Sequence, residues 1–242
     1  MTAEDRSRKH PDAPWRNFYG RRHGKKLRKG QADLLATALA DLSPPGIGWE
    51  ENPDRLALDL SAIYPGKREI WLEIGFGGGE HAIAQAQANP DVQILGAEPF
   101  INGVAKLLAA IERAGVKNLA VTDADARDVM DVLPEASIAR AFLLYPDPWP
   151  KTRHHKRRFV NPEQMDMLAR VLTPGAHLRI ATDIADYVRH TLEVMDRDPR
   201  FEWLAERPTD WRDPWPDWPG TRYEAKAQRE GRTPHYLTFR RT

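Results

Sequence analysis

The chain has 242 residues, no cysteine and a formal net charge of +1, with 41% hydrophobic and 29% charged residues. Its longest apolar stretches are far shorter than the roughly 18–20 residues needed to span a bilayer, and its charged N-terminus lacks the apolar core of a secretory signal. Because the chain has no cysteine, disulfides and thiolate metal sites are excluded. The length fits one domain with an appendage, and we expect a cytoplasmic protein.

The small net charge hides an uneven distribution of charged residues. Residues 1–30, which we call the arm, contain ten Lys and Arg against three Asp and Glu, whereas the rest of the chain has 26 basic and 32 acidic residues. A basic arm on an acidic body is typical of nucleic-acid contact; a solvated tail is the other interpretation. We expect a basic, partly disordered arm with a short helix over residues 1–50, and one domain over residues 51–242.

Hydrophobic runs alternate with helical stretches, which is typical of βαβ units around a mostly parallel sheet. A first helix is expected at 31–42, followed by a linker with Pro44, Pro45 and Gly46. The expected strands lie at 69–74, 92–98, 119–122, 139–145 and 177–182, with a later antiparallel pair at 201–205 and 236–240. The expected helices lie at 79–88, 101–114, 162–171 and 184–196. Residues 211–219 alternate Trp, Pro and Asp and are expected to form a loop.

The first expected strand ends in Glu73 and leads into a turn with Gly75, Gly77 and Gly79. Such a turn at the carboxyl end of a parallel strand lets a ligand touch the backbone. The spacing differs from that of dinucleotide sites, and no Lys-Ser or Lys-Thr follows, so a P-loop is not indicated. Glu73 would repel a pyrophosphate but suits a ligand with an ammonium or sulfonium charge, as in S-adenosylmethionine. A plain tight turn is the alternative.

Two further acids follow the next two strands. Glu98 lies about 20 residues after the glycines, where an acidic side chain reaches ribose hydroxyls. Asp125 follows the third strand, where it can accept a hydrogen bond from an adenine amino group or cap the next helix. Acids at three successive strand ends favour an adenosyl site. This arrangement resembles that of class I methyltransferases, which use S-adenosylmethionine.

The fourth strand ends in a turn at residues 145–150 that contains three prolines. Prolines fix the backbone and remove their own donors, so the turn is rigid and exposes carbonyl groups and the Asp147 carboxylate. Asp147 can accept hydrogen bonds from a guanine edge. Trp149 offers a stacking face or is a buried structural residue. The turn is similar to the Asn-Pro-Pro-Tyr of amino-group methyltransferases, with Asp in place of Asn and different proline spacing.

A basic run follows this turn. Its members are Lys151, Arg153, His154, His155, Lys156, Arg157 and Arg158. Such a run would contact a phosphate backbone and make binding salt-dependent, whereas a solvated charged face is the alternative. The two histidines lack the spacing and partners of metal ligands, and no metal is expected.

Residues 145–158 resemble the signature of bacterial tRNA (guanine-N7)-methyltransferases, in which Asp-Pro-Trp-Pro-Lys-x-Arg-His-x-Lys-Arg-Arg occurs. Residues 181–183 and 221–224, with Lys226 and Gly231, agree with that family. The resemblance spans about residues 68–240. It implies a class I, Rossmann-like α/β fold, with a seven-stranded, mostly parallel sheet and helices on both faces. It also implies methyl transfer from S-adenosylmethionine to N7 of a guanine in the variable loop of tRNA, forming 7-methylguanosine.

The resemblance implies roles for single residues as well. Cofactor contacts are expected at Glu73, Glu98, Asp125 and Asp147 and at the three glycines of the turn. Asp147 is also the expected catalytic residue. Substrate contacts are expected at Lys151, Asp183, Thr221, Arg222, Tyr223 and Glu224. RNA contacts are expected at Arg153, His154, His155, Lys156, Arg157 and Arg158.

Guanine N7 carries a lone pair and no proton, so catalysis is expected to come from positioning rather than from a base. The expected partner is tRNA, with no membrane and no obligate protein partner, and the chain is expected to be a monomer or homodimer. Two alternatives remain. One is a methyltransferase acting on another RNA atom or on a small molecule, although the basic run argues against the latter. The other is a catalytically silent RNA-binding protein, which the three acids argue against.

Overall fold

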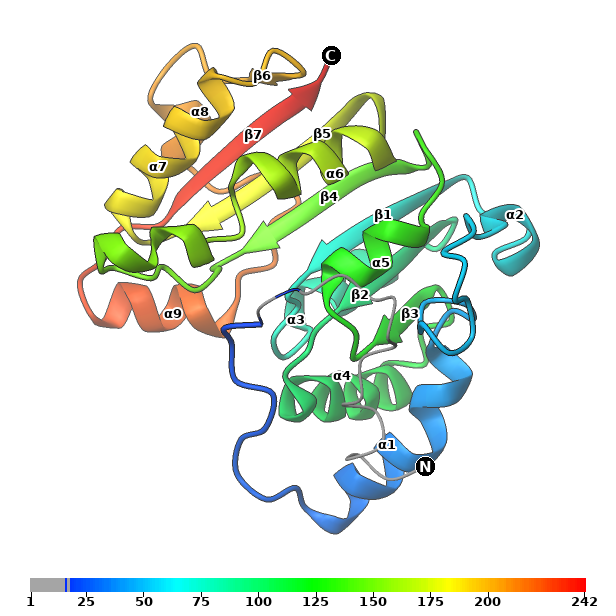
Figure 1. Cartoon of the computed structure of the whole chain (residues 1–242). Helices are drawn as coiled ribbons and strands as arrows, with labels where there is room; N and C mark the ends of the chain where they lie inside the picture. Colours follow the sequence, from blue (N-terminus) through cyan, green and yellow to red (C-terminus); the bar gives the residue numbers. More distant parts are fainter. Residues whose placement is uncertain (1–15, 17) are drawn as a thin grey trace.

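The computed structural model describes Arg16 and residues 18–242, so the expected disorder of the arm falls largely outside the described residues. A seven-stranded sheet runs through the molecule in the order β3-β2-β1-β4-β5-β7-β6 (Figure 1). The strands are β1 (Glu69–Ile74), β2 (Val92–Ala97), β3 (Leu119–Thr122), β4 (Ile138–Leu144), β5 (Leu172–Thr182), β6 (Phe201–Trp203) and β7 (His235–Arg241). Strands β1 to β5 are parallel, and β7 is antiparallel to both β5 and β6. The expected mostly parallel sheet is confirmed.

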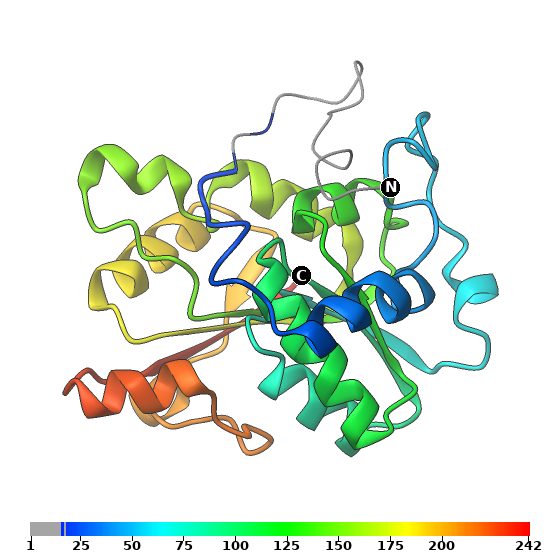
Figure 2. The same cartoon turned by 90° about the horizontal axis from the view of Figure 1, so that it is seen from below.

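Helices cover both faces of the sheet, as Figures 1 and 2 show. On one face lie α1 (Lys29–Leu42), α3 (Glu80–Ala88) and α4 (Ile101–Ala114), and on the other α5 (Ala126–Val132), α6 (Pro162–Val171) and α7 (Ala185–Asp196). Shorter elements are α2 (Leu60–Ile63), the 3-10 helix η2 (Thr152–Arg157), α8 (Thr209–Arg212) and α9 (Arg222–Arg229). No helix among the described residues is both long and apolar enough to cross a membrane.

Two hydrophobic cores result from the alternation of side chains along the strands. In β1, Leu72 and Ile74 pack beneath α5 and α6, whereas Trp71 packs beneath α3 and α4. In β4, Leu143 packs in the same core as Leu72 and Ile74, and Phe142 packs in the same core as Trp71. Both faces are buried, as parallel sheets require.

Two segments differ from the expected elements. Strand β5 begins at Leu172 rather than at 177, and its pairing with β4 shifts register between Ile138 and Arg140. This irregularity accommodates the Pro174-Gly175 pair that was expected to lie outside the strand. The loop expected at 211–219 is helical at its start, because Trp211 lies in α8.

Helix α1 is packed on the main body of the fold, with Leu39 only 3% exposed in the core formed with α4. The division of the chain near residue 50 stays a prediction.

The parallel register brings three strand ends level. Ile74 of β1 pairs with Ala97 of β2 and with Leu143 of β4. The residues that follow therefore meet at one edge of the sheet: the glycine-rich turn, Glu98 and the turn at 145–150. This edge is where open α/β sheets bind ligands.

Candidate active site

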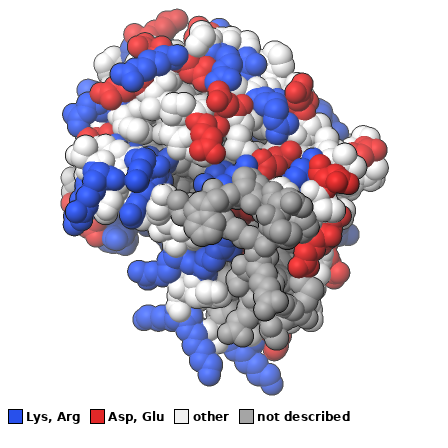
Figure 3. Space-filling view, viewed as in Figure 1, with Lys and Arg blue, Asp and Glu red and all other residues white. Residues whose placement is uncertain are grey.

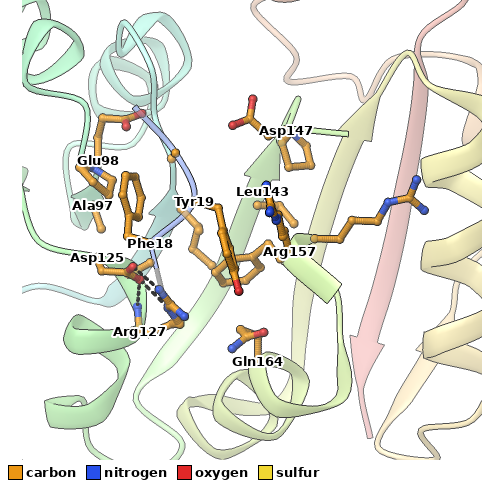
Figure 4. Close-up of a pocket in the computed structure, with 18 of the residues that line it drawn as sticks. Phe18, Tyr19, Ala97, Glu98, Asp125, Arg127, Leu143, Asp147, Arg157 and Gln164 are labelled. Atoms are coloured by element: carbon orange, nitrogen blue, oxygen red, sulfur yellow. Dashed lines mark hydrogen bonds and ion pairs between the residues drawn. The ribbon is translucent and has the colours of Figure 1, made fainter. Parts of the chain in front are cut away.

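A cavity of about 580 Å³ lies at this carboxyl edge. The strand ends supply Gly75, Gly77, Glu98 and Asp125, and the turn after β4 supplies Asp147. Arm residues complete the lining. Figure 4 shows Phe18 and Tyr19 between Glu98 and Asp125 on one side and Asp147 and Arg157 on the other.

Two of the three expected glycines, Gly75 and Gly79, serve different purposes. Gly75 has a φ of 70°, and a Cβ added there would meet no atom within 4 Å. The bare backbone at Gly75 therefore faces open space in the cavity, where a ligand can approach it. Gly79 has a φ of 78°, and its Cβ would lie 2.4 Å from Leu107 Cδ1, so it allows α4 to pack closely.

Glu98 links the glycine-rich turn to the start of α4. Its Oε2 accepts a hydrogen bond from Gly77 N at 2.7 Å, and its Oε1 accepts one from Phe100 N at 2.9 Å. Burial raises the pKa of Glu98, and the nearby charge of Asp147 raises it further. Each oxygen keeps a lone pair for a ligand.

Asp125 caps α5 and is 8% exposed. It accepts hydrogen bonds from Arg127 N at 3.0 Å and from Arg127 Nη2 at 2.6 Å. Burial opposes ionisation of Asp125, but these hydrogen bonds and the charge of Arg127 outweigh it and hold the pKa below its usual value. Capping and a place in the cavity are both observed for this residue.

Asp147 lies on a strained turn. The flanking Tyr145 and Trp149 have φ values of 51° and 43°, in the left-handed region that side chains with a Cβ rarely adopt. Asp147 itself is exposed at the cavity. Burial raises the pKa of the Tyr223 phenol, and the charges of Glu98 and Asp147 add to this effect.

Described residues of the arm line the cavity and are held on both sides of it. Arg16 forms ion pairs with Asp128, at 3.0 Å, and with Asp131 of α5. On the far side, the Arg22 carbonyl accepts a hydrogen bond from Ile101 N at 3.0 Å, at the start of α4. Residues 18–21, between these contacts, form part of the cavity wall.

Tyr19 and Trp149 face each other edge to face, with ring centroids 6.2 Å apart. The Arg157 guanidinium lies over both rings, 4.6 Å from the Tyr19 centroid and 4.9 Å from that of Trp149. Cation–π attraction therefore joins the arm to the basic run. Trp149 is half-buried and is both a packing residue and part of the cavity wall.

Glu73 is buried behind the cavity rather than at its surface. It is 2% exposed, and its Oε2 lies 2.7 Å from Nδ1 of the equally buried His81. The His81 ring packs against the Phe142 ring, with centroids 4.5 Å apart. Direct cofactor contact by Glu73 stays a prediction.

The six expected substrate residues have different surroundings. Lys151 is exposed at the start of η2, and Asp183 forms an ion pair with Arg232. Arg222 forms an ion pair with Glu80 at 2.7 Å. Tyr223 lines the cavity, whereas Thr221 caps α9 and Glu224 is buried. Of these six residues, the structure brings Tyr223 to the cavity.

Most of the basic run lies on η2, and Lys156 and Arg157 of this helix line the cavity. Arg153 and Lys156 are exposed, and Figure 3 shows basic residues gathered over η2 and α9 and again over the arm. His154 lies edge-on to Trp149, with centroids 6.0 Å apart, and His155 Nε2 lies 3.6 Å from Asp186 Oδ2. No three Asp, Glu or His side chains of the described chain gather as metal ligands would.

Arg158 is the buried member of the basic run. It is 1% exposed, donates from Nε to the Pro148 carbonyl at 2.9 Å, and forms an ion pair with Asp186. The hydrogen bonds from Arg158 and Arg189 lower the pKa of Asp186 to about 2. The Arg158 guanidinium holds the turn at 145–150 against α7. The expected RNA contact at Arg158 stays a prediction.

Phe18 and Tyr19 were missed in the sequence, where the arm was interpreted from its charge alone. Aromatic residues interleaved with Arg16 and Arg21 are a recognisable pattern for contact with bases. The partners of Tyr19 are Trp149 and Arg157, which lie more than a hundred positions away in the sequence, so local pattern does not show what Tyr19 contacts.

Residues 67–237 match the family described as "Putative methyltransferase". The chain is 65% identical over 226 residues to a tRNA (guanine-N(7)-)-methyltransferase of Roseobacter denitrificans, covering 93% of this chain and 96% of that protein. It is 62% identical over 231 residues to the protein of the same name from Ruegeria pomeroyi, covering 96% and 97%.

Among solved structures, the 16S rRNA methyltransferase KamB superposes with a TM-score of 0.57, covering 77% of this chain and 94% of that one. At 15% identity, this likeness shows the class I methyltransferase fold alone.

The burial of Arg158 leads to a stability prediction. Arg158→Ala should lower the free energy of unfolding by roughly 1.5–3 kcal/mol, because it removes charge-assisted hydrogen bonds within the fold. Arg153→Ala, an exposed change in the same run, should alter it by less than about 0.5 kcal/mol. Denaturant unfolding of both variants measures the free energy of unfolding. Equal stabilities would contradict a structural role for Arg158.

Proposed function

Since this chain belongs to the family of tRNA (guanine-N7)-methyltransferases, which transfer a methyl group from S-adenosylmethionine to guanine N7 in tRNA, we propose that the cavity described above is where this transfer occurs. The target is a guanine of the variable loop, and the product is 7-methylguanosine. The observation that carries the proposal is the meeting of Asp147 with Gly75, Glu98 and Asp125 in one cavity.

The residues on one side of the cavity fit an adenosyl cofactor. Gly75 presents open backbone, and Glu98 keeps lone pairs at the position from which an acid reaches ribose hydroxyls. Asp125 lies at the next strand end, where adenine would be held. The bound cofactor supplies an electrophilic methyl group on a sulfonium centre. Gly77 and Glu98 fix the shape of the cradle through their hydrogen bond.

Asp147 and Trp149 form the side of the cavity that would receive the base. The Asp147 carboxylate accepts hydrogen bonds from the imino and amino groups of guanine, which leaves N7 on another edge of the base. N7 needs no deprotonation, so the rate enhancement comes from orientation, which can lower the barrier by roughly 7–11 kcal/mol. The prolines on both sides of Asp147 restrict the backbone and so limit where the carboxylate can lie.

Two basic surfaces lie beside this cavity and suit a tRNA backbone. One consists of Arg153 and Lys156 on η2, and the other of Arg21, Lys25 and Lys26 of the arm; all of these residues are exposed. Because the arm also supplies Tyr19 to the wall, it would contact both the RNA backbone and the target base. The enzyme would act in the cytoplasm as a monomer or homodimer, with no obligate protein partner.

Asp147→Ala should reduce kcat by about 100-fold or more, because the target base loses the group that orients it. The tRNA dissociation constant should change little, since the basic surfaces remain. Single-turnover methylation of tRNA, followed by nucleoside analysis for 7-methylguanosine, measures the effect. Near-normal turnover would remove Asp147 from the mechanism.

Glu98→Ala should weaken S-adenosylmethionine binding by on the order of 1.5–3 kcal/mol, since a charge-assisted hydrogen bond is removed. Isothermal calorimetry of the purified protein tests this without any activity assay. Glu112→Ala, an exposed acid near the far end of α4, is the control and should bind normally. An unchanged affinity in Glu98→Ala would exclude the residue from the cofactor site.

The double change Arg153→Ala with Lys156→Ala should weaken tRNA binding and reduce its salt slope by about 0.7–0.9 for each phosphate that is no longer neutralised. The double change Arg113→Ala with Lys117→Ala removes the same charge from exposed positions at the opposite edge of the sheet. Titrations over a range of salt concentrations compare the two variants. Identical slopes would show that η2 is only a solvated surface.

A further inference from the structure

A buried aromatic cluster lies between the loop after α8 and strand β7. Trp215, Trp218 and Tyr236 meet edge to face, with ring centroids 5.4–5.6 Å apart. Trp215 Nε1 donates to Thr238 Oγ1 at 2.9 Å, and Trp218 Nε1 donates to Glu224 Oε2 at 2.9 Å. The Trp- and Pro-rich loop is thus a packed part of the fold.

Glu224 is the charged member of this cluster. It is 8% exposed, and its second oxygen accepts a hydrogen bond from the Tyr236 hydroxyl. Two donors compensate for the burial of a carboxylate. The spacing of Thr221 and Glu224 is that of a capping box, in which the Glu side chain returns to the cap. Here Thr221 accepts from Glu224 N at 3.1 Å, but the Glu224 side chain points inward to Tyr236.

Tyr236 lies directly behind the turn that carries Asp147. In the β5–β7 ladder it pairs with Ala181, whose carbonyl accepts a hydrogen bond from Tyr145 N at 2.7 Å. Burial raises the pKa of the Tyr145 phenol, and Tyr236 and Glu224 raise it further. Tyr145 has a φ of 51° and begins the strained turn.

The first turn of α9 touches the other half of the cavity. Tyr223 stacks on Tyr145 with centroids 6.3 Å apart and planes 19° from parallel. A Cβ at Gly77 would lie 3.0 Å from the Tyr223 ring, so this ring also covers the glycine-rich turn. Because Glu224 follows Tyr223 directly, fixing Glu224 fixes the ring that contacts both turns.

We propose that Glu224 and Tyr236 are positioning residues for methyl transfer: their buried hydrogen bond holds the Asp147 turn and Tyr223 in place, and neither residue touches tRNA. The inference rests on the proposed function and differs from the direct substrate contact expected for Glu224. Its measurable consequence is a change in turnover without a change in tRNA affinity.

The test compares Tyr236→Phe, Glu224→Ala and Glu224→Gln. The first two remove the hydrogen bond and should lower single-turnover kcat by about tenfold or more, as small displacements of reacting groups do. The tRNA dissociation constant should stay within about twofold, because neither side chain touches the RNA. Glu224→Gln keeps an acceptor oxygen and adds a donor, so it should recover most of the rate that Glu224→Ala loses.

Thr238→Val is the matched control, because it removes the partner of Trp215 in the same cluster and leaves Glu224 untouched. It should leave kcat unchanged. If kcat fell equally in Thr238→Val and in Tyr236→Phe, the loss would come from disturbed packing of the cluster rather than from the Glu224–Tyr236 hydrogen bond. This result would overturn the proposal. A raised tRNA dissociation constant with normal kcat in Glu224→Ala would show direct contact and also overturn it.

Calorimetry with S-adenosylmethionine and thermal unfolding establish that each variant is folded. If Glu224→Ala does not fold, the comparison of Tyr236→Phe with Thr238→Val decides, because Tyr236→Phe keeps the ring. The wild-type protein separates this inference from the proposed function. Failure of the wild type to form 7-methylguanosine in tRNA would refute the function itself, whereas an active wild type with a fully active Tyr236→Phe refutes the positioning role alone.

Discussion

The parallel pairing of β2, β1 and β4 is the constraint on which the site depends. Parallel strands place their carboxyl ends at one edge, and the register sets Ile74 level with Ala97 and Leu143. The glycine-rich turn, Glu98 and the strained turn at 145–150 therefore meet at this edge. Helices on both faces bury the strands and leave this edge as the place where polar groups gather.

Residues that follow a strand directly could be located from the sequence, because the strand itself carries them to the edge of the sheet. Glu98 and Asp147 belong to this class, and the cavity contains both. The strand ends were recognisable because a buried parallel strand is a short hydrophobic run bounded by turn residues. Strand β5 was placed five residues too late because Pro174 and Gly175 indicate a turn in isolation, whereas the pairing with β4 tolerates them.

The sequence does not show which members of a polar motif point into the fold. Arg153 and Arg158 belong to one basic run, yet the first is exposed and the second is 1% exposed. Arg153 lies on the 3-10 helix, whereas Arg158 follows its end in an extended conformation and reaches the Pro148 carbonyl. Glu224 is a similar case, since its orientation depends on Tyr236, twelve positions away on another strand. Tyr19 lines the cavity through contacts with residues brought close only by the tertiary fold.

The arm is synthesised first, but it can pack against α5 only after that helix has been synthesised. Arg16 leaves the ribosome 115 residues ahead of Asp131, its partner on α5. At about 5–20 residues per second, roughly 6–23 s pass before that partner exists. During this interval the arm is a cationic segment without its acidic partners on α5. The wall that it forms can therefore close only after most of the parallel sheet has been synthesised, so a stalled or truncated chain would present the strand edge without its cover.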